Sequence, residues 1–216
     1  MITKQKKNVI HINLISQITI YQSDKNKERK LKRLIKFLII LIMLLLLYFI
    51  LFKVVQVDKI ILKKIYPLKY SEYVEKYSKE YEIDPYMTYA IIKAESNFKE
   101  NSKSTSNAIG LMQIMESTAT ETASKMDLNI TEEDLFEPEL NIKIGLYYFA
   151  ILLEKYNGNE KLAIIAYNAG IGNVDKWIKE GVIKADGTNI ENVPFKETNN
   201  YVRRILRYYQ IYKDLY

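Results

Sequence analysis

A carboxyl group, an amide and a tyrosine–asparagine pair stand out in this sequence because each interrupts an otherwise apolar helical segment. Glu95 follows directly on an apolar stripe, Gln113 lies in the run Gly110-Leu111-Met112-Gln113, and Tyr167 and Asn168 end a third segment. A carboxyl group among apolar and aromatic neighbours, with amides and hydroxyls nearby, is kept protonated near neutral pH and can act as a general acid. Periodicity does not establish that these segments meet, and on spacing alone Glu95 is one of 26 acidic residues.

Other kinds of active site are excluded by composition. The chain has no Cys, which removes disulfides, thiolate catalysis and Cys-ligated metals. The single His, His11, lies in a polar N-terminal arm, so Ser-His-Asp chemistry and His-rich metal sites are also removed. Carboxylates are left as the natural acid/base groups.

The helix that carries Glu95 has a clear start signal. Asp84 is an N-cap acceptor, and Pro85 occupies the first helical position. Apolar residues then recur at helical spacing and predict a buried face, and Glu95 comes near the C-terminal end of this helix. The helix dipole disfavours an anion at that end, which helps to raise the pKa of the carboxyl group.

The remaining elements are also predicted to be helical. A tyrosine-rich stripe over 70–81 precedes the Glu95 helix, and further helices are expected over 118–126, 138–156, 160–168, 174–180 and 197–213. Residues 181–194 contain two Gly and a Pro and are expected to form a loop. No segment shows the alternation of a strand, and the fold class is therefore all-α.

The basic character of the chain is confined to one end. The net charge is +6, but residues 1–36 hold ten Lys and Arg against Asp24 and Glu28, so the other residues together carry −2. A nearly neutral folded part argues against nucleic acid as a partner.

An apolar run over Leu34–Phe52 predicts a transmembrane anchor. It has 19 residues and a single charge, Lys36, close to the roughly 20 residues that cross a hydrocarbon core. A buried core helix is seldom apolar all round over this length. A cleaved signal peptide would have a shorter core and a small-x-small cleavage site, and none follows. The basic flank predicts a cytoplasmic N-terminus, so the residues after Phe52 should lie outside the cytoplasm.

Five motifs, in order, resemble the lytic transglycosylase family with the soluble-type catalytic domain, a relative of goose-type lysozyme. They are Glu95-Ser96 after Ala90 to Ala94, Gly110-Leu111-Met112-Gln113 within Ala108 to Met115, Pro138 to Asn141 with Gly145, Ala166-Tyr167-Asn168-Ala169-Gly170, and Glu197-Thr198-Asn199-Asn200-Tyr201-Val202. One short motif would be weak, whereas five in sequence are strong. The resemblance covers about residues 66–216 and implies a lysozyme-like helical fold.

The resemblance also implies roles for individual residues. Glu95 would be the catalytic acid/base, and Gly110 and Gly170 would allow tight turns near the groove. The residues expected to bind or orient the sugar, or to support those that do, are Ser96, Ser104, Met112, Gln113, Tyr167, Asn168, Glu197 and Tyr201. Met112 is expected to wall the cleft, and Ser96 and Ser104 to hydrogen-bond the acid or the substrate.

The expected organisation is a basic cytoplasmic arm (1–33), a transmembrane anchor (34–52), a stalk (53–65) and a transglycosylase domain (66–216). By resemblance, the substrate is the peptidoglycan glycan strand, cleaved without water to leave 1,6-anhydromuramic acid ends. The resemblance also implies that this reaction needs neither a metal nor a cofactor. A hydrolytic muramidase would share the fold and the acid, and a non-catalytic glycan-binding subunit of an envelope machine is a further alternative. A partnership with envelope or secretion machinery stays open, since the sequence contains no partner motif.

Overall fold

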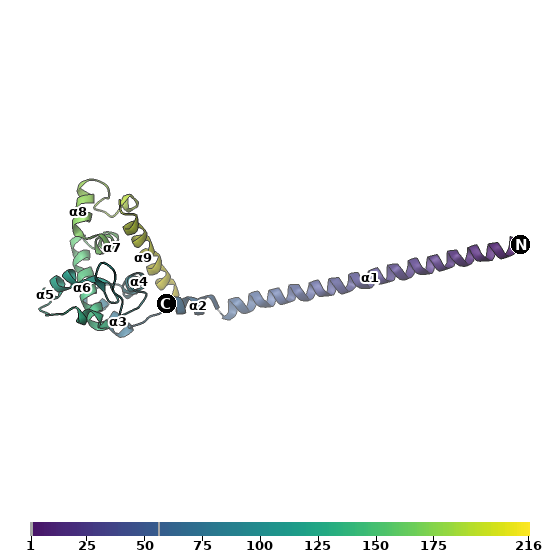
Figure 1. Cartoon of the computed structure of the whole chain (residues 1–216), viewed down its shortest axis with the longest axis horizontal. Helices are drawn as coiled ribbons and strands as arrows, with labels where there is room; N and C mark the ends of the chain where they lie inside the picture. The colour runs from purple at the N-terminus through teal and green to yellow at the C-terminus, as the bar shows by residue number, and fades with distance from the viewer. Residues whose placement is uncertain (1, 56) are drawn as a thin grey trace. The chain divides into compact units, whose positions relative to one another are not determined.

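The computed structural model describes the backbone of residues 2–55 and 57–216 and the side chains of residues 25–52 and 59–216 (Figure 1). The chain divides into two compact units, Met1–Ile61 and Leu62–Tyr216. The side chain of His11 and the polar contacts of residues 1–24 lie outside the described residues.

The N-terminal unit is dominated by one long helix, α1 (Ile2–Val55), and α2 (Val57–Ile65) follows it. The helix extends well beyond the predicted anchor because the sequence has no Gly or Pro before Pro67 to end it. Among the described residues, Lys25–Phe52 is the one stretch long and apolar enough to cross a membrane, and none of its apolar window is buried. Membrane anchors and signal sequences both meet this test.

The second unit is mostly helical, which confirms the predicted fold class. Its helices are α3 (Ser71–Glu80), α4 (Pro85–Glu95), α5 (Glu116–Ser124), α6 (Pro138–Lys155), α7 (Glu160–Ala169), α8 (Ile171–Lys179) and α9 (Lys196–Leu215), with short 3₁₀ turns η1 (Glu133–Phe136) and η2 (Ile190–Asn192). The predicted helices are all found, with boundaries that differ from the prediction by at most three residues. The 181–194 loop contains η2, which its composition did not indicate.

A small antiparallel hairpin, with an isolated bridge between Lys103 and Ile109 beside it, departs from all-α structure in the described part of this unit. Strands β1 (Ala108–Ile109) and β2 (Ile114–Met115) pair Ala108 with Met115 and Ile109 with Ile114. Strands of two residues are too short to show alternation in the sequence. The hairpin carries the 110–113 turn between them, and this turn contributes to the site described below.

Helix α4 lies at the centre of the unit. Asp84 caps it by accepting a hydrogen bond from the Tyr86 amide at 2.8 Å, and Pro85 opens it, as predicted. Residues 87–92 are buried on every side of the helix, so the buried surface is wider than the predicted stripe. α4 packs most extensively against α9, and α9 also packs against α7 (Figure 1). The C-terminal end of α4 is thereby held close to both helices.

Candidate active site

A cleft of about 560 Å³ opens at the C-terminal end of α4. Four elements contribute to it: the end of α4, the 104–115 segment with its hairpin, the end of α7 and the start of α9. The residues that line it are Glu95, Ser104, Thr105, Ser106, Ala108, Gln113, Met115, Tyr167, Asn168, Ala169, Phe195, Glu197 and Thr198. A smaller hollow of about 200 Å³ shares five of these residues and reaches toward Tyr148 and Gly170.

Glu95 is the last residue of α4, and its carboxyl group faces the cleft from a largely buried position. Burial raises the pKa of this carboxyl to about 7, and the hydrogen bond from Tyr201 and the positive charge of Arg204 act in the opposite direction. The Tyr201 hydroxyl donates to Glu95 Oε1 at 2.5 Å. The carboxyl can therefore be both protonated and ionised near neutral pH, which is what a group that gives and later takes a proton requires.

Two buried phenols flank this carboxyl. Burial raises the pKa of both Tyr201 and Tyr167 well above the ordinary tyrosine value, and the Glu95 charge acts in the same direction. Both hydroxyls are therefore neutral donors. Tyr201 donates to Glu95, while Tyr167 donates to the carbonyl oxygen of Met112 at 2.9 Å and so joins α7 to the hairpin turn.

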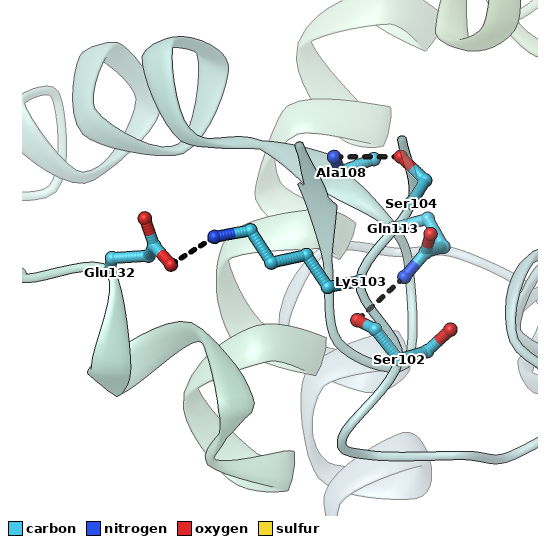
Figure 2. A network of polar contacts seen from close by, with 6 residues as sticks. All are labelled: Ser102, Lys103, Ser104, Ala108, Gln113 and Glu132. Atoms are coloured by element: carbon cyan, nitrogen blue, oxygen red, sulfur yellow. Dashed lines mark hydrogen bonds and ion pairs between the residues drawn. The ribbon is translucent and has the colours of Figure 1, made fainter. Parts of the chain in front are cut away.

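The segment 102–113 forms the opposite wall and is held by its own polar contacts (Figure 2). Gln113 Nε2 donates to the carbonyl oxygens of Ser102 at 3.0 Å and Gly110 at 2.9 Å. Ser104 Oγ accepts from the amides of Ser106 and Ala108 at 3.2 and 3.0 Å, and Lys103 pairs with Glu132 outside the wall. These bonds fix the Gln113 amide where it lines the cleft.

Asn141, on α6, holds the hairpin turn in place through hydrogen bonds to its backbone. Its side chain is fully buried on α6, and its Nδ2 donates to the carbonyl oxygens of Ile109 at 3.0 Å and Leu135 at 2.7 Å. Its Oδ1 accepts from the Met112 amide at 2.8 Å. The sequence placed Asn141 in a motif without giving it a role, and the structure shows that it satisfies three backbone groups that would otherwise be buried without partners.

Most of the residues predicted for the site come together. The cleft is lined by Glu95 together with Ser104, Gln113, Tyr167, Asn168 and Glu197. Tyr201 does not line the cleft, but its hydroxyl donates a hydrogen bond to the Glu95 carboxyl.

Two predicted residues lie elsewhere. Ser96 is 6% exposed and donates to the Ile92 carbonyl at 3.3 Å, so it belongs to the helix end and is not part of the cleft lining. Met112 is fully buried, and its sulfur lies 2.5 Å from where a Cβ on Gly145 would be, so its side chain fills the core and does not form the wall of the cleft. It is the backbone of Met112 that serves the site, through Tyr167 and Asn141.

Phe195 and Met115 also line the cleft, and neither was predicted from the sequence. Each is 49% exposed, although both are large and apolar. Phe195 precedes α9 and meets the Trp177 ring edge-on, with centroids 5.1 Å apart. Sugar rings have apolar faces that pack on such surfaces, and an aromatic residue directly after Pro194 at a predicted loop end was the signal available in the sequence.

Within residues 25–52 and 59–216, no group of three or more His, Asp or Glu side chains is arranged to hold a metal ion. The chemistry that the described site supports is proton transfer by the largely buried Glu95 carboxyl group, with hydroxyls and amides of the cleft placed to orient a ligand.

The raised pKa of Glu95 predicts a pH-dependent effect on stability. Its folded value of about 7 lies above the ordinary 4.5, so this group's contribution is fully present below about pH 4.5 and is lost as pH rises through 7. Glu95→Gln stays neutral and should therefore be more stable than the wild type at pH 8, with an upper limit of roughly 3 kcal/mol from the size of the pKa shift. At pH 4 the two should be equal. Urea unfolding followed by the fluorescence of the single Trp, Trp177, measures both, and equal stability at pH 8 would contradict the raised pKa.

Comparison with known proteins gives a consistent set of similarities. The profile of the transglycosylase SLT domain family matches residues 72–189. The chain is 34% identical over 155 residues to the soluble lytic murein transglycosylase of Salmonella typhimurium, covering 70% of this chain and 24% of that protein. It is 38% identical over 116 residues to the membrane-bound lytic murein transglycosylase C of Edwardsiella ictaluri, covering 49% and 32%.

Solved structures agree with these similarities. An inactive mutant of the lytic transglycosylase Slt from Pseudomonas aeruginosa matches with a TM-score of 0.66 and 34% identity, over 71% of this chain and 25% of that one. The 70 kDa soluble lytic transglycosylase of Escherichia coli matches with a TM-score of 0.65 and 32% identity, over 71% and 25%. The chain thus spans about a quarter of the length of the soluble relatives that it matches.

Proposed function

This chain belongs to the transglycosylase SLT domain family, and from that premise we propose that it is a lytic murein transglycosylase that cleaves the glycan strands of peptidoglycan. The observation that carries the proposal is the Glu95 carboxyl group, which lies in a cleft with a pKa of about 7 and a hydrogen bond from Tyr201. The relatives named above are lytic murein transglycosylases, which supports the same reaction class.

The proposed reaction uses Glu95 twice. Most glycosidases employ two carboxyl groups, one of them as nucleophile or base for water. Here protonated Glu95 gives its proton to the oxygen that bridges N-acetylmuramic acid and N-acetylglucosamine, and the C1–O bond breaks. The Glu95 carboxylate then takes the proton of the muramic C6 hydroxyl as that oxygen bonds to C1. A 1,6-anhydro ring forms, Glu95 is protonated again, and no water is consumed.

The other cleft residues have supporting parts in this proposal. Gln113, Tyr167 and Asn168 lie on two walls of the cleft, where their amide and hydroxyl groups can orient the sugar beside Glu95. Ser104 and Glu197 lie farther along the same cleft and would contact the strand. Ser96 and Met112 act only through the positions of the helix end and the hairpin turn.

Product analysis tests this function directly. The full chain in detergent should release muropeptides that end in 1,6-anhydromuramic acid when it is incubated with purified peptidoglycan, and mass spectrometry identifies these ends by the loss of one water. Reducing ends in their place would show a hydrolytic muramidase. Binding of glycan strands without release of any product would show a non-catalytic subunit.

We also propose that the apolar part of α1 anchors the enzyme, with residues 1–33 in the cytoplasm, 34–52 in the membrane, 53–65 as a stalk and 66–216 on the cell-wall side. The support is the apolar stretch with its basic flank, together with a relative that is named as membrane-bound. The end of the stalk packs on the catalytic unit, since Lys93 Nζ donates to the Ile65 carbonyl at 2.6 Å.

This topology makes a simple prediction. Protease added to intact protoplasts should remove the catalytic unit, while a tag placed before residue 25 should be cut only after the membrane is opened, because the basic flank keeps that end inside. Immunoblotting with antibodies to the two ends reads the result. Protection of the catalytic unit would reverse the orientation, and release of the untethered unit into the medium would indicate a cleaved signal sequence.

A further inference from the structure

A carboxyl group that must act first as an acid and then as a base has to populate both its protonated and its ionised form near the working pH. Burial favours the protonated state alone, and the deeper the burial, the less often the carboxylate forms. Something in the site must therefore oppose burial. The Tyr201 hydrogen bond does so in part, and α9, which carries Tyr201, also presents a positively charged group to the Tyr201 ring.

We infer that Arg204 is a positioning residue of this site, whose guanidinium charge acts on Glu95 and on the phenol of Tyr201 so that one carboxyl group can serve as both acid and base. This inference rests on the proposed role of Glu95. It assigns a function to an exposed residue that lies outside the cleft lining and outside every residue expected from the sequence to form the site.

The contact that carries the inference is made along α9. Arg204 lies three residues after Tyr201, and side chains at this spacing are neighbours on a helix surface. The Arg204 Cζ atom is 5.7 Å from the centroid of the Tyr201 ring, within the range of a cation–π interaction. The hydroxyl of the same ring donates to Glu95 at 2.5 Å. Arg204, Tyr201 and Glu95 thus form a chain of contacts from the surface to the cleft.

The Arg204 charge acts in the same direction on both groups that it affects: it lowers the pKa of Glu95 and that of Tyr201. The Arg204 charge favours the ionised form of Glu95 and opposes the rise in its pKa that burial causes. It also acts against the raised pKa of Tyr201, which makes that hydroxyl a stronger hydrogen-bond donor to the carboxylate. The other titratable groups that line the cleft are Tyr167, a neutral phenol from α7, and Glu197, a second carboxyl at the start of α9. Neither of them supplies a positive charge.

The chain offers a matched control for this residue. Arg203 is the preceding residue of α9, is exposed, and carries the same charge, but it points to another side of the helix. Arg203→Met therefore makes the same change of net charge without touching the Tyr201 ring. Arg204→Met removes charge and keeps an apolar stem over the ring, and Arg204→Lys restores the charge.

The test is the pH dependence of cleavage by the full chain in detergent, with purified peptidoglycan as substrate. The alkaline limb of kcat/KM reports loss of the Glu95 proton in the free enzyme. Arg204→Met should move this limb to higher pH by about half a unit at low salt, because a favourable charge is lost, while Arg204→Lys and Arg203→Met should stay near wild type. Raising salt from about 0.05 M to about 0.5 M should move the wild-type limb in the same direction and leave the Arg204→Met limb in place, because salt screens an exposed charge.

A second readout separates this inference from the proposed function. Titration of the Glu95 carboxyl followed by carbon NMR of glutamate-labelled protein needs no substrate, and the Glu95→Gln spectrum assigns the signal. The same order of variants is expected there, whatever products the enzyme forms. An Arg204→Met titration that coincides with wild type would overturn the inference. So would an Arg204→Lys titration shifted as far as that of Arg204→Met, since the effect would then not come from the charge.

Discussion

Glu95→Gln is expected to abolish cleavage of peptidoglycan while leaving the fold intact. Glutamine has nearly the same shape and can still accept the Tyr201 hydrogen bond, but it can neither donate a proton to the bridging oxygen nor remove one from the C6 hydroxyl. General acid–base catalysis by one positioned group is worth roughly 10²–10⁴-fold, and because the same group serves both steps, the loss should be at least that large. Release of muropeptides per mole of enzyme measures it.

The other carboxyl groups of the unit provide the controls. Glu116→Gln, at the exposed start of α5, and Glu100→Gln, whose carboxyl accepts from Tyr70 at 3.0 Å, should cost little activity. Glu197→Gln changes a residue that lines the same cleft and should give an intermediate loss. A Glu95→Gln enzyme that still formed anhydromuropeptides at a near wild-type rate would disprove the assignment. If the stability of this variant at pH 8 is no lower than that of the wild type, the lost activity does not come from unfolding.

The parts of the site that depend on helix caps and helical periodicity could be predicted from the sequence. Asp84 and Pro85 mark the start of α4. The apolar stripe that follows indicates which part of the helix is buried and places Glu95 at its C-terminal end. The end of α7 and the start of α9 were located in the same way. Caps and helical periodicity depend on neighbours within a few residues, which is why the sequence shows them plainly.

The contacts that complete the site were not predictable in this way, because they join residues far apart in the chain. The hydrogen bond between Tyr201 and Glu95 spans 106 residues, and Asn141 reaches the hairpin from 29 and 32 residues away. A side chain such as Met112 can point to the core or to the cleft from the same motif. Only the packing of α6 against the hairpin decides that it points to the core.

These long-range contacts make the 110–113 turn a rigid part of the site. From α6, Asn141 bonds to the Met112 amide within the turn and to the Ile109 carbonyl just before it, and a third bond ties Asn141 itself to the Leu135 carbonyl. Tyr167 donates to the Met112 carbonyl from α7, and the Gln113 side chain donates back to the Gly110 carbonyl. The turn therefore has little freedom to adjust to a change in its backbone, and its glycine is the position at which this can be tested.

Gly110→Ala is expected to destabilise the fold by more than the same change at Gly170 or Gly172. Gly110 has φ of +78°, where an L-residue costs about 1–2 kcal/mol. A Cβ there would lie 2.2 Å from Asn141 Nδ2 and 2.4 Å from the Leu135 carbonyl oxygen, so the amide must leave its place. Each buried group that loses its partner adds about 1–3 kcal/mol. The total should be several kcal/mol, and cleavage should fall with it because Gln113 moves.

The same substitution at two other glycines allows the cost of backbone strain to be measured apart from the cost of steric crowding. Gly170 also has a positive φ, +83°, but nothing lies within 4 Å of its would-be Cβ, so Gly170→Ala should cost only the strain, about 1–3 kcal/mol. Gly172, in the first turn of α8, has open space and ordinary helical backbone, so Gly172→Ala should be neutral or stabilise by up to about 1 kcal/mol. Urea unfolding of the three variants, followed by Trp177 fluorescence, should therefore rank Gly110→Ala well below Gly170→Ala, and Gly172→Ala at or above wild type. If Gly110→Ala cost no more than Gly170→Ala, the Asn141 network would not be holding the turn.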